Sequence, residues 1–228
     1  MDIPILYEDN HVLVVEKPVN IPVQADQTGD SDMLSLLKVD IKERYQKPGN
    51  VFLGLVHRLD RPVGGVMVFA KTSKAASRLS DSIRRGVFER TYLAVVRGKP
   101  AVQKGVLEHT LLKDHRKNKV HVVPKKTKKA KDARLIYHTI AHTEGLSLLE
   151  VQLDTGRPHQ IRVQLSHEGT PIYGDQKYGA HMNKPGQQIA LWAHELSFEH
   201  PTQKHMITVQ SHPPHAYPYD LLYSRKIS

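Results

Sequence analysis

Short apolar runs rich in β-branched and aromatic residues recur along almost the whole chain, with turn residues between them. Such runs are typical of short strands, whereas a parallel sheet would require strands that alternate regularly with helical segments. We expect strands at residues 3–6, 11–15, 51–56, 66–70, 88–96, 106–112, 120–123, 135–141, 146–153, 188–198 and 206–210. The pattern predicts an α+β fold with a largely antiparallel sheet.

Two segments between these runs have helical spacing. Apolar residues recur every three or four positions over 34–45, after a possible N-cap at Ser31 or Asp32. Thr72 is placed to cap a second helix, and Gly86 is placed to end it.

The composition limits the class of protein. The chain has 228 residues, 39% of them hydrophobic, and no long Pro/Gly/Ser linker, which predicts one domain over residues 1–228. No apolar run reaches membrane-spanning length, and the N-terminus lacks the pattern of a signal peptide. Because there is no cysteine, disulfides and thiolate metal sites are excluded. We therefore expect a cytoplasmic protein, and a monomer by default.

The positive charge is concentrated in one segment. The net charge is +10, and residues 113–131 alone carry nine Lys or Arg against one acid, Asp114. The segment could be a solvated hairpin tip. Like charges repel, however, so a phosphate-binding role and a polyanionic partner are favoured. Four of these lysines are expected to contact RNA: Lys125, Lys126, Lys128 and Lys129.

The tetrad His57-Arg-Leu-Asp60 lies between two of the predicted strands, so Asp60 is expected on a tight loop. Arg58 and Arg61 flank the acid, and a nearby cation favours the ionised form of a carboxyl group. Two interpretations stay open on spacing alone. Asp60 is either an ionised, reactive carboxylate or part of a structural Asp–Arg pair in a turn.

A second informative segment runs from Thr155 to Arg162. Pro158 is expected as the first residue of a helix that ends near Gly169, because proline is favoured at that position. Backbone N–H groups at such a helix start would suit an anion, and Arg157 and His159 lie beside it. A capped helix with surface arginines is the alternative.

Tyr92 lies in the predicted strand 88–96, within Arg90-Thr-Tyr-Leu-Ala94. From its position alone, a packing aromatic is the first interpretation.

These three segments together resemble the RluA-type pseudouridine synthases. The family signatures are H-R-L-D-x-x-T-S-G around Asp60, K-x-Y-L-A around Tyr92, and G-R-x-H-Q-I-R-V-x-L followed by G-x-P-I-x-G-D-x-x-Y-G around Arg162. The chain departs from them at Val63-Gly64, where the family has Thr-Ser. The resemblance implies a mixed, bent sheet with flanking helices and a central active-site cleft. It also implies that no S4-like RNA-binding domain precedes the catalytic domain, which opens near residue 3.

The resemblance also implies roles for residues. Asp60 is the catalytic nucleophile, Arg162 pairs with it, and Tyr92 stacks on the target base. Arg58 contacts the flipped nucleotide. Contacts to RNA are further expected from Lys71, Arg157 and His159. No cofactor is implied.

We therefore predict an RNA pseudouridine synthase that acts on uridines of ribosomal or transfer RNA. A non-catalytic RNA-binding domain of the same fold is one alternative, and a carboxylate-dependent hydrolase is another. The absence of a second carboxylate near the tetrad counts against the hydrolase, since glycoside hydrolysis generally uses two. Fifteen histidines are present, but none has the spacing of a metal-ligand motif, so no metal is expected.

Overall fold

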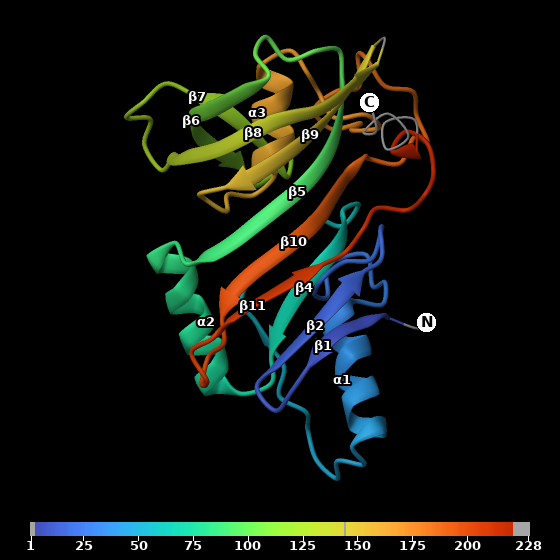
Figure 1. Cartoon of the computed structure of the whole chain (residues 1–228), viewed down its shortest axis with the longest axis vertical. Coiled ribbons are helices and arrows are strands. Elements are labelled where there is room, and N and C mark those ends of the chain that lie inside the picture. Colours follow the sequence, from blue (N-terminus) through green and yellow to red (C-terminus); the bar gives the residue numbers. More distant parts are fainter. Residues whose placement is uncertain (1–2, 144, 221–228) are drawn as a thin grey trace. The chain divides into compact units, whose positions relative to one another are not determined.

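The computed structural model describes residues 3–143 and 145–220. Eleven strands and three helices are assigned within them (Figure 1). The order is β1 (Ile5–Glu8), β2 (Val12–Lys17), α1 (Met33–Arg44), β3 (Gly54–Leu55), β4 (Gly64–Ala70), α2 (Ser73–Arg85), β5 (Phe88–Arg97), β6 (Lys104–Asp114), β7 (Lys119–Val123), β8 (Lys131–Thr143), β9 (Leu146–Leu153), α3 (Gln160–His167), β10 (Leu191–Glu199) and β11 (Met206–Gln210).

The chain divides into two compact units. Unit 1 comprises Met1–Arg90 and Ala193–His212, and unit 2 comprises Thr91–Trp192 and Pro213–Ser228. Strands β5 and β10 contribute residues to both units by sequence. The single domain over 1–228 stays a prediction.

Unit 1 contains the strands β1, β2, β4 and β10 in that order, with β3 also paired to β4 and β11 to β10. Strand β2 runs antiparallel to β4, from the pair Val12–Ala70 to the pair Lys17–Gly65. All residues of β4 are buried, as are the four valine and leucine residues at the start of β2. This buried pair of strands is the support from which the loop of Asp60 emerges.

The two helices of unit 1 begin where the sequence predicts, and α2 also ends there. Helix α1 ends at Arg44, before Lys47-Pro48-Gly49, where the sequence predicts its end. Asp32 caps α1 by accepting a hydrogen bond from the backbone N–H of Ser35. Thr72 caps α2 in the same way through the N–H of Ala75, and Gly86 ends it in the left-handed conformation with φ of 74°. These local signals suffice because each of them acts within one helical turn.

Unit 2 contains the strand order β5-β9-β8-β6-β7. Neighbouring strands in this order are antiparallel, and β9 has the predicted bounds Leu146–Leu153. Helix α3 packs on β6 and β7 and places Val163 in an apolar cluster with Leu111, Val120 and Ala133. The α+β fold and its largely antiparallel sheet are thus confirmed.

Two predicted strands are shorter than expected. Of residues 51–56, only Gly54 and Leu55 pair, with Ala70 and Phe69 of β4. Strand β10 is also a neighbour of β4, so the edge available to β3 is limited. The strand expected to begin at residue 188 begins at Leu191. Among the described residues, no helix has the length and apolar character needed to cross a membrane.

Candidate active site

Asp60 lies, as predicted, on a tight loop between two strands of unit 1. The loop connects β3 to β4, and the carbonyl oxygen of Asp60 accepts a hydrogen bond of 3.0 Å from the N–H of Val63. The side chain of Asp60 is partly buried, and that of Arg58 is exposed. The loop therefore presents one acid and one solvent-facing arginine side by side.

His57 holds the beginning of this loop. Its Nε2 accepts a hydrogen bond of 3.1 Å from the backbone N–H of Val68, so this nitrogen carries no proton. Burial and the charge of Arg90 lower the pKa of His57 to about 3. The ring also packs edge-on against Phe88. The histidine of the tetrad is thus neutral and tied to strand β4.

Lys17 supports the same loop from the protein interior. It is the last residue of β2 and has no exposed surface. Its Nζ donates hydrogen bonds to the carbonyl oxygens of Pro18 at 2.9 Å, Arg61 at 3.0 Å and Val63 at 2.8 Å. Sequence reasoning missed this residue, because Lys17-Pro18 indicates only the end of a strand. The one available signal is a lysine at the end of a strand whose first four residues are apolar.

Arg61 anchors the loop on its outer side. Its guanidinium donates to the carbonyl oxygen of Asn20 and to Thr28, and it forms ion pairs with Asp26 and Asp30. The hydrogen bond from Arg61 helps to lower the pKa of Asp30. The positive charge of Arg61 is therefore matched by these two acids, although the sequence suggested Asp60 as its neighbour.

Val63 and Gly64, which replace the Thr-Ser of the family signature, are both buried. Val63 is 2% exposed, and its carbonyl oxygen accepts one of the hydrogen bonds from Lys17. Gly65, which matches the last glycine of the signature, has φ of 115°, and a Cβ atom there would lie 2.2 Å from the carbonyl oxygen of Ala193. A side chain is thus excluded at Gly65. The loop is held by the side chains of Lys17 and Arg61, and Val63-Gly64 supply none of the hydroxyl groups of the family signature.

Tyr92 belongs to unit 2. It lies on β5 opposite Val151 of β9 and is 7% exposed. Tyr92 is therefore a buried packing aromatic, as its position in the sequence predicts. Stacking on a base stays a prediction.

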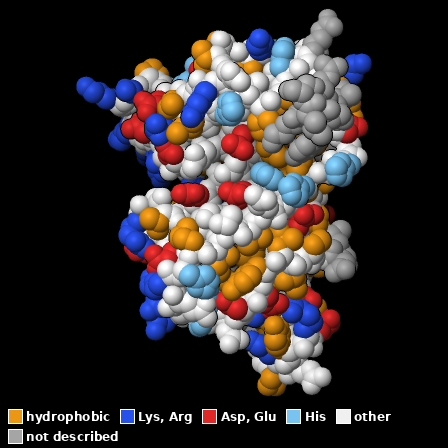
Figure 2. All heavy atoms as spheres, in the orientation of Figure 1, with side chains coloured by type: hydrophobic (Ala, Val, Ile, Leu, Met, Phe, Trp, Pro, Cys, Tyr) orange, Lys and Arg blue, Asp and Glu red, His pale blue; other side chains and the backbone are white. Residues whose placement is uncertain are grey.

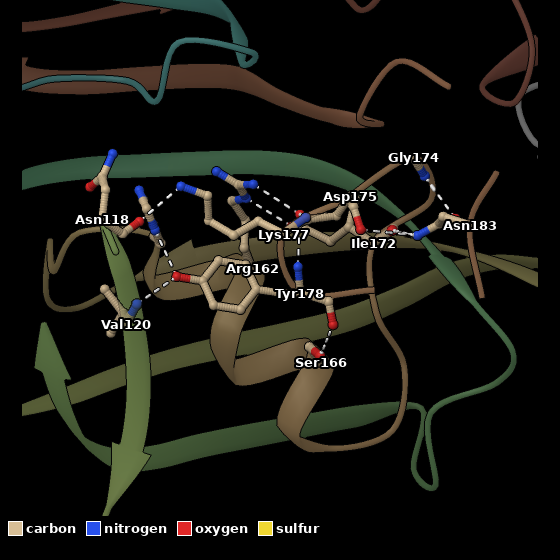
Figure 3. A network of polar contacts seen from close by, with 11 residues as sticks. Asn118, Val120, Arg162, Ser166, Ile172, Gly174, Asp175, Lys177, Tyr178 and Asn183 are labelled. Atoms are coloured by element: carbon tan, nitrogen blue, oxygen red, sulfur yellow. Dashed lines mark hydrogen bonds and ion pairs between the residues drawn. The ribbon is translucent and has the colours of Figure 1, made fainter. Parts of the chain in front are cut away.

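Arg162 forms a buried ion pair with Asp175. Its Nε and Nη2 donate to the two carboxylate oxygens at 2.8 and 2.9 Å, and both side chains are almost fully buried (Figure 3). The same carboxylate accepts the backbone N–H groups of Lys177 and Tyr178. Asp175 is therefore an acceptor for four donors, which fixes the plane of the guanidinium. The pairing of Arg162 with Asp60 joins residues of different units and stays a prediction.

Tyr178 connects this ion pair to the hairpin of β6 and β7. Its ring lies 5.4 Å from the guanidinium carbon of Arg162. Its hydroxyl oxygen accepts the N–H of Val120 at 2.8 Å (Figure 3). The same oxygen lies 2.7 Å from Nδ1 of His159. Nearby, Nζ of Lys177 donates to the carbonyl oxygen of Asn118. Asp175 and Tyr178 are part of the second motif, but sequence reasoning assigned them no role.

The prediction that helix α3 starts at Pro158 is wrong. The helix starts at Gln160, after His159, which has a left-handed backbone with φ of 51° and no side-chain cap. The side-chain oxygen of Gln160 accepts from Thr155 and from the N–H of Arg157. The backbone N–H of Arg157, which was expected to face an anion, therefore donates to the side chain of Gln160 instead.

Two residues expected to contact RNA have partners within the protein. The side chain of Lys71 is only 10% exposed, and its Nζ lies 2.7 Å from Oε1 of Glu8. The same Nζ lies over the ring of Tyr45. Nε of Arg157 donates to the carbonyl oxygen of Asp132 at 2.8 Å. These contacts account for both side chains without RNA, and their RNA contacts stay predictions.

The basic segment forms two loops on either side of β7. Figure 2 shows Lys and Arg side chains projecting from the edge of unit 2 where Figure 1 draws this strand. In the first loop, Asp114 accepts the backbone N–H groups of Arg116 and Lys117, which lowers the pKa of this acid. Exposed basic side chains of the two loops are those of Arg116, Lys117, Lys125, Lys126, Lys128 and Lys129, and Lys131 at the start of β8 is also exposed.

The second loop consists of two successive turns of the same kind. The N–H of Thr127 bonds to the carbonyl oxygen of Pro124, and the N–H of Ala130 bonds to that of Thr127. The third residue of each turn is a lysine with positive φ, 73° at Lys126 and 66° at Lys129. Turns of this type favour glycine or asparagine at that position. Lysine is therefore present there despite a conformational cost.

One group of side chains has the composition of a metal site. His109, His167 and Glu168 place possible ligand atoms within 4.8 Å of one another. The amide nitrogen of Gln164 donates to the carbonyl oxygen of Leu107 and lies 3.0 Å from Nδ1 of His109. Nδ1 is thus an acceptor, and the ring proton is on Nε2, which faces Glu168 at 3.1 Å. The positions of His109 and Glu168 are thus accounted for by these hydrogen bonds.

Comparison with known proteins identifies the family. The profile described as "RNA pseudouridylate synthase" matches residues 11–167, which include Asp60, Tyr92 and Arg162. The chain therefore belongs to the RNA pseudouridylate synthase family.

Relatives and solved structures agree with this result. The uncharacterized RNA pseudouridine synthase YlyB of Bacillus subtilis is 31% identical over 204 residues, covering 88% of this chain and 66% of that protein. The ribosomal large subunit pseudouridine synthase C of Buchnera aphidicola is 32% identical, covering 91% of this chain and 66% of that protein. The chain thus spans slightly less than two thirds of these relatives. The structure of human RNA pseudouridylate synthase domain containing 4 has the same fold, with a TM-score of 0.78 at 24% identity, covering 92% of this chain and 88% of that one.

Proposed function

We propose that this chain is an RNA pseudouridine synthase that isomerises uridine in structured RNA, with Asp60 as the nucleophile. The single observation that carries the proposal is the Asp60 loop. Within the family match, one acid lies on a loop anchored by Lys17 from below and by Arg61 from outside. Such rigidity is what a group that must attack at a defined position requires.

The reaction needs no cofactor. The bond between N1 and C1′ of uridine breaks, the uracil rotates, and a bond forms between C5 and C1′. C5 loses its proton and N1 gains one, so the product is an isomer. The carboxylate of Asp60 can attack or stabilise the anomeric carbon, as a retaining glycosidase does, or it can attack C6 of the base. Both routes require an ionised carboxylate.

The other predicted site residues complete the proposal. Tyr92 would stack on the detached base, and Arg162, aligned by Asp175, would pair with Asp60. Exposed Arg58 would contact the flipped nucleotide, since a uridine within a helix cannot reach a loop carboxylate without leaving its stack.

The exposed lysines of the β7–β8 loop would bind the RNA backbone. Phosphate contacts position a nucleic acid without specifying its sequence. Repeated turns with lysine at strained positions support this role, because packing in the protein does not explain them. His159 lies next to this basic region through Tyr178 and would contribute to the same surface.

Ribosomal RNA of the large subunit is the substrate to test first. The names of the synthase C of Buchnera aphidicola and the synthase D of Pseudomonas aeruginosa refer to that subunit. Transcripts of large-subunit RNA and of transfer RNA, assayed side by side with the purified protein, would separate the two classes. Maps of pseudouridine in cells with and without the gene would then give the positions.

The catalytic assignment is tested with Asp60→Asn. We expect release of tritium from RNA labelled at C5 of uridine to fall at least about 1,000-fold, because the amide is no nucleophile. RNA binding, measured by filter retention, should stay within about twofold. Turnover by the variant would contradict the role of Asp60. Absence of turnover by the wild-type protein on all RNAs would favour a non-catalytic binding domain, and free uracil among the products would favour a hydrolase.

The RNA-binding surface is tested by changing Lys125, Lys126, Lys128 and Lys129 to Gln together. For every phosphate that the variant no longer binds, the slope of log K against log salt should decrease by about 0.7 to 0.9. Lys42→Gln combined with Lys99→Gln is the matched control, since both side chains are exposed and lie outside the basic segment. An unchanged slope in the fourfold variant would show that this loop does not contact the RNA backbone.

A further inference from the structure

The side chains of His109, His167 and Glu168 lie together at the C-terminal end of α3, and the proposed function gives none of them a role. His167 is the last residue of the helix, Glu168 is its C-cap, and His109 lies on strand β6. One possible ligand atom from each residue lies within 4.8 Å of the other two. Two imidazoles and one carboxylate are a ligand set that Zn²⁺ uses in proteins, with water in the fourth position.

The distances within this group are close to those around a bound ion. Nε2 of His109 lies 3.1 Å from Oε1 of Glu168, and the rings of His109 and His167 meet edge to face with centroids 4.9 Å apart. Neighbouring ligand atoms of tetrahedral zinc are about 3.3 to 3.5 Å apart, since each lies about 2.0 to 2.2 Å from the metal. His167 and Glu168 are exposed, so rotation of their side chains can close the remaining gap.

Two packed elements of unit 2 hold these ligands. Strand β6 pairs with β7 on one side and with β8 on the other, where His109 lies opposite Ala133. Helix α3 packs on β6 and β7, with Val163 in the apolar cluster between them (Figure 1). The backbone positions of all three ligands are therefore set by the fold, as a preorganised site requires.

The charges in this group favour a cation. Among the residues that the structure describes, Glu168 forms an ion pair with His109 and with no Lys or Arg. The end of α3 adds the partial negative charge of a helix C-terminus. Burial lowers the pKa of His109, so its ring is neutral near pH 7, the form in which histidine binds metals.

Gln164 contacts His109 from the protein interior and has no exposed surface. Its Nε2 donates to the carbonyl oxygen of Leu107 at 3.1 Å and lies 3.0 Å from Nδ1 of His109. Its Oε1 is buried and has no hydrogen-bond partner within the described part of the chain. A buried acceptor without a donor is costly, so this oxygen calls for an explanation.

A metal ion on His109 would give this oxygen a donor. In the metal-free ring, Nδ1 accepts from Gln164 and Nε2 carries the proton. An ion at Nε2 displaces that proton, and the neutral ring then carries one on Nδ1 instead. A half-turn of the Gln164 amide places Oε1 opposite this N–H, in exchange for the hydrogen bond to Leu107. Histidines that bind metals are oriented by such a contact at their other nitrogen.

We propose that His109, His167 and Glu168 form a binding site for Zn²⁺. Gln164 orients the ring of His109 in this site, and the ion joins the end of α3 to β6. The spacing of histidines in the sequence predicts no metal, because a strand and a helix supply these ligands and meet only in the folded chain. The site is independent of the proposed function, since none of these residues takes part in the proposed reaction.

The first test measures affinity on untagged protein that EDTA has freed of metals. Zn²⁺ is titrated in competition with a chromophoric chelator, and we expect one ion per chain. His109→Ala and Glu168→Gln should each lower the affinity by at least about 100-fold, the upper end of what loss of a supporting contact costs. His115→Ala combined with His121→Ala is the matched control, since both histidines are exposed and lie outside the site. Equal affinity of His109→Ala and the wild type overturns the proposal.

The second test follows the proton of His109 by NMR on protein with ¹⁵N-labelled histidine, and His109→Ala assigns the signals. The ring proton should move from Nε2 to Nδ1 when Zn²⁺ is added. A ring that keeps its proton on Nε2 in saturating Zn²⁺ contradicts binding at this residue.

The third test is thermal unfolding with and without Zn²⁺. An ion that binds only the folded protein stabilises it, so Zn²⁺ should raise the melting temperature of the wild type and of the His115→Ala, His121→Ala control. It should leave Glu168→Gln unchanged. Because Glu168 is exposed, this variant should unfold near the wild-type temperature when metal is absent. The same rise in Glu168→Gln as in the wild type would refute the site.

Discussion

Lys17 in unit 1 and Arg162 in unit 2 are both buried cations, but they are compensated in different ways. Lys17 directs its three donors at backbone carbonyl oxygens. Arg162 forms a two-bond contact with the carboxylate of Asp175. Carbonyl groups satisfy hydrogen bonds without cancelling a charge, whereas a carboxylate does both.

This difference in partners determines the structural role of each side chain. The hydrogen bonds of Lys17 tie the backbone after Asp60 to the end of β2. The charge of Arg162 is already balanced, so its value lies in the fixed plane and direction of the guanidinium. Three changes would break or sharpen this comparison.

Removing the charge of Asp175 should have the largest effect. Asp175→Asn leaves the guanidinium of Arg162 buried without its anion, and we expect the free energy of unfolding to fall by about 3–5 kcal/mol. Asp81→Asn is the control, because Asp81 forms exposed ion pairs with Arg84 and Arg85 and should change stability by less than about 1 kcal/mol. Urea denaturation measures both. Equal losses in the two variants would show that the buried pair contributes no more than a surface pair.

The second-largest effect expected is a change in the free energy of unfolding with pH that is caused by Lys17. Burial lowers its pKa to about 7, against about 10.4 in an unfolded chain. Between these values the unfolded chain binds the proton that the folded protein has released, so stability from this group rises with pH, by up to about 1.4 kcal/mol per pH unit. The contribution is complete above pH 10.4 and is lost as the pH falls through about 7. The unfolding free energy of the wild type minus that of Lys17→Met should rise from pH 7 to pH 10, and a constant difference would refute this.

Loss of the Tyr178 hydroxyl should have the smallest effect. Tyr178→Phe keeps the ring beside Arg162 but leaves the N–H of Val120 without this acceptor, at a cost of about 1–3 kcal/mol. Tyr217→Phe, at an exposed position, should be neutral. Thermal unfolding measures both. A neutral Tyr178→Phe would show that the hairpin does not depend on the network around Arg162.

Local signals made much of the fold predictable. The caps at Asp32 and Thr72 and the left-handed Gly86 act within one helical turn, so the sequence defines α1 and α2 well. Strand β9 was likewise predicted with its observed bounds, since turn residues enclose its apolar run. Helix α3 was misplaced because the side chain of Gln160 bonds to Thr155 and to backbone groups, an arrangement that competes with a proline start.

The candidate site was predictable in its residue types but not in its supports. Asp60, Tyr92 and Arg162 were found because they stand in short motifs that match the family signatures. Lys17 and Asp175 were not given roles. Their partners are decided by contacts between distant segments, and no local pattern encodes which carbonyl oxygen or guanidinium will face them.

The sequence by itself therefore determined the start of α1, both ends of α2, most strands, the family and the acid on its loop, since each depends on neighbouring residues or on a short motif. Only the tertiary structure decided how that acid is supported. Lys17 meets the carbonyl oxygen of Val63 across 46 positions of sequence, and it does so because antiparallel pairing sets Lys17 opposite Gly65. The hydrogen-bond partners of a buried charged group come from segments distant in sequence, and the register of the sheet determines which segments those are.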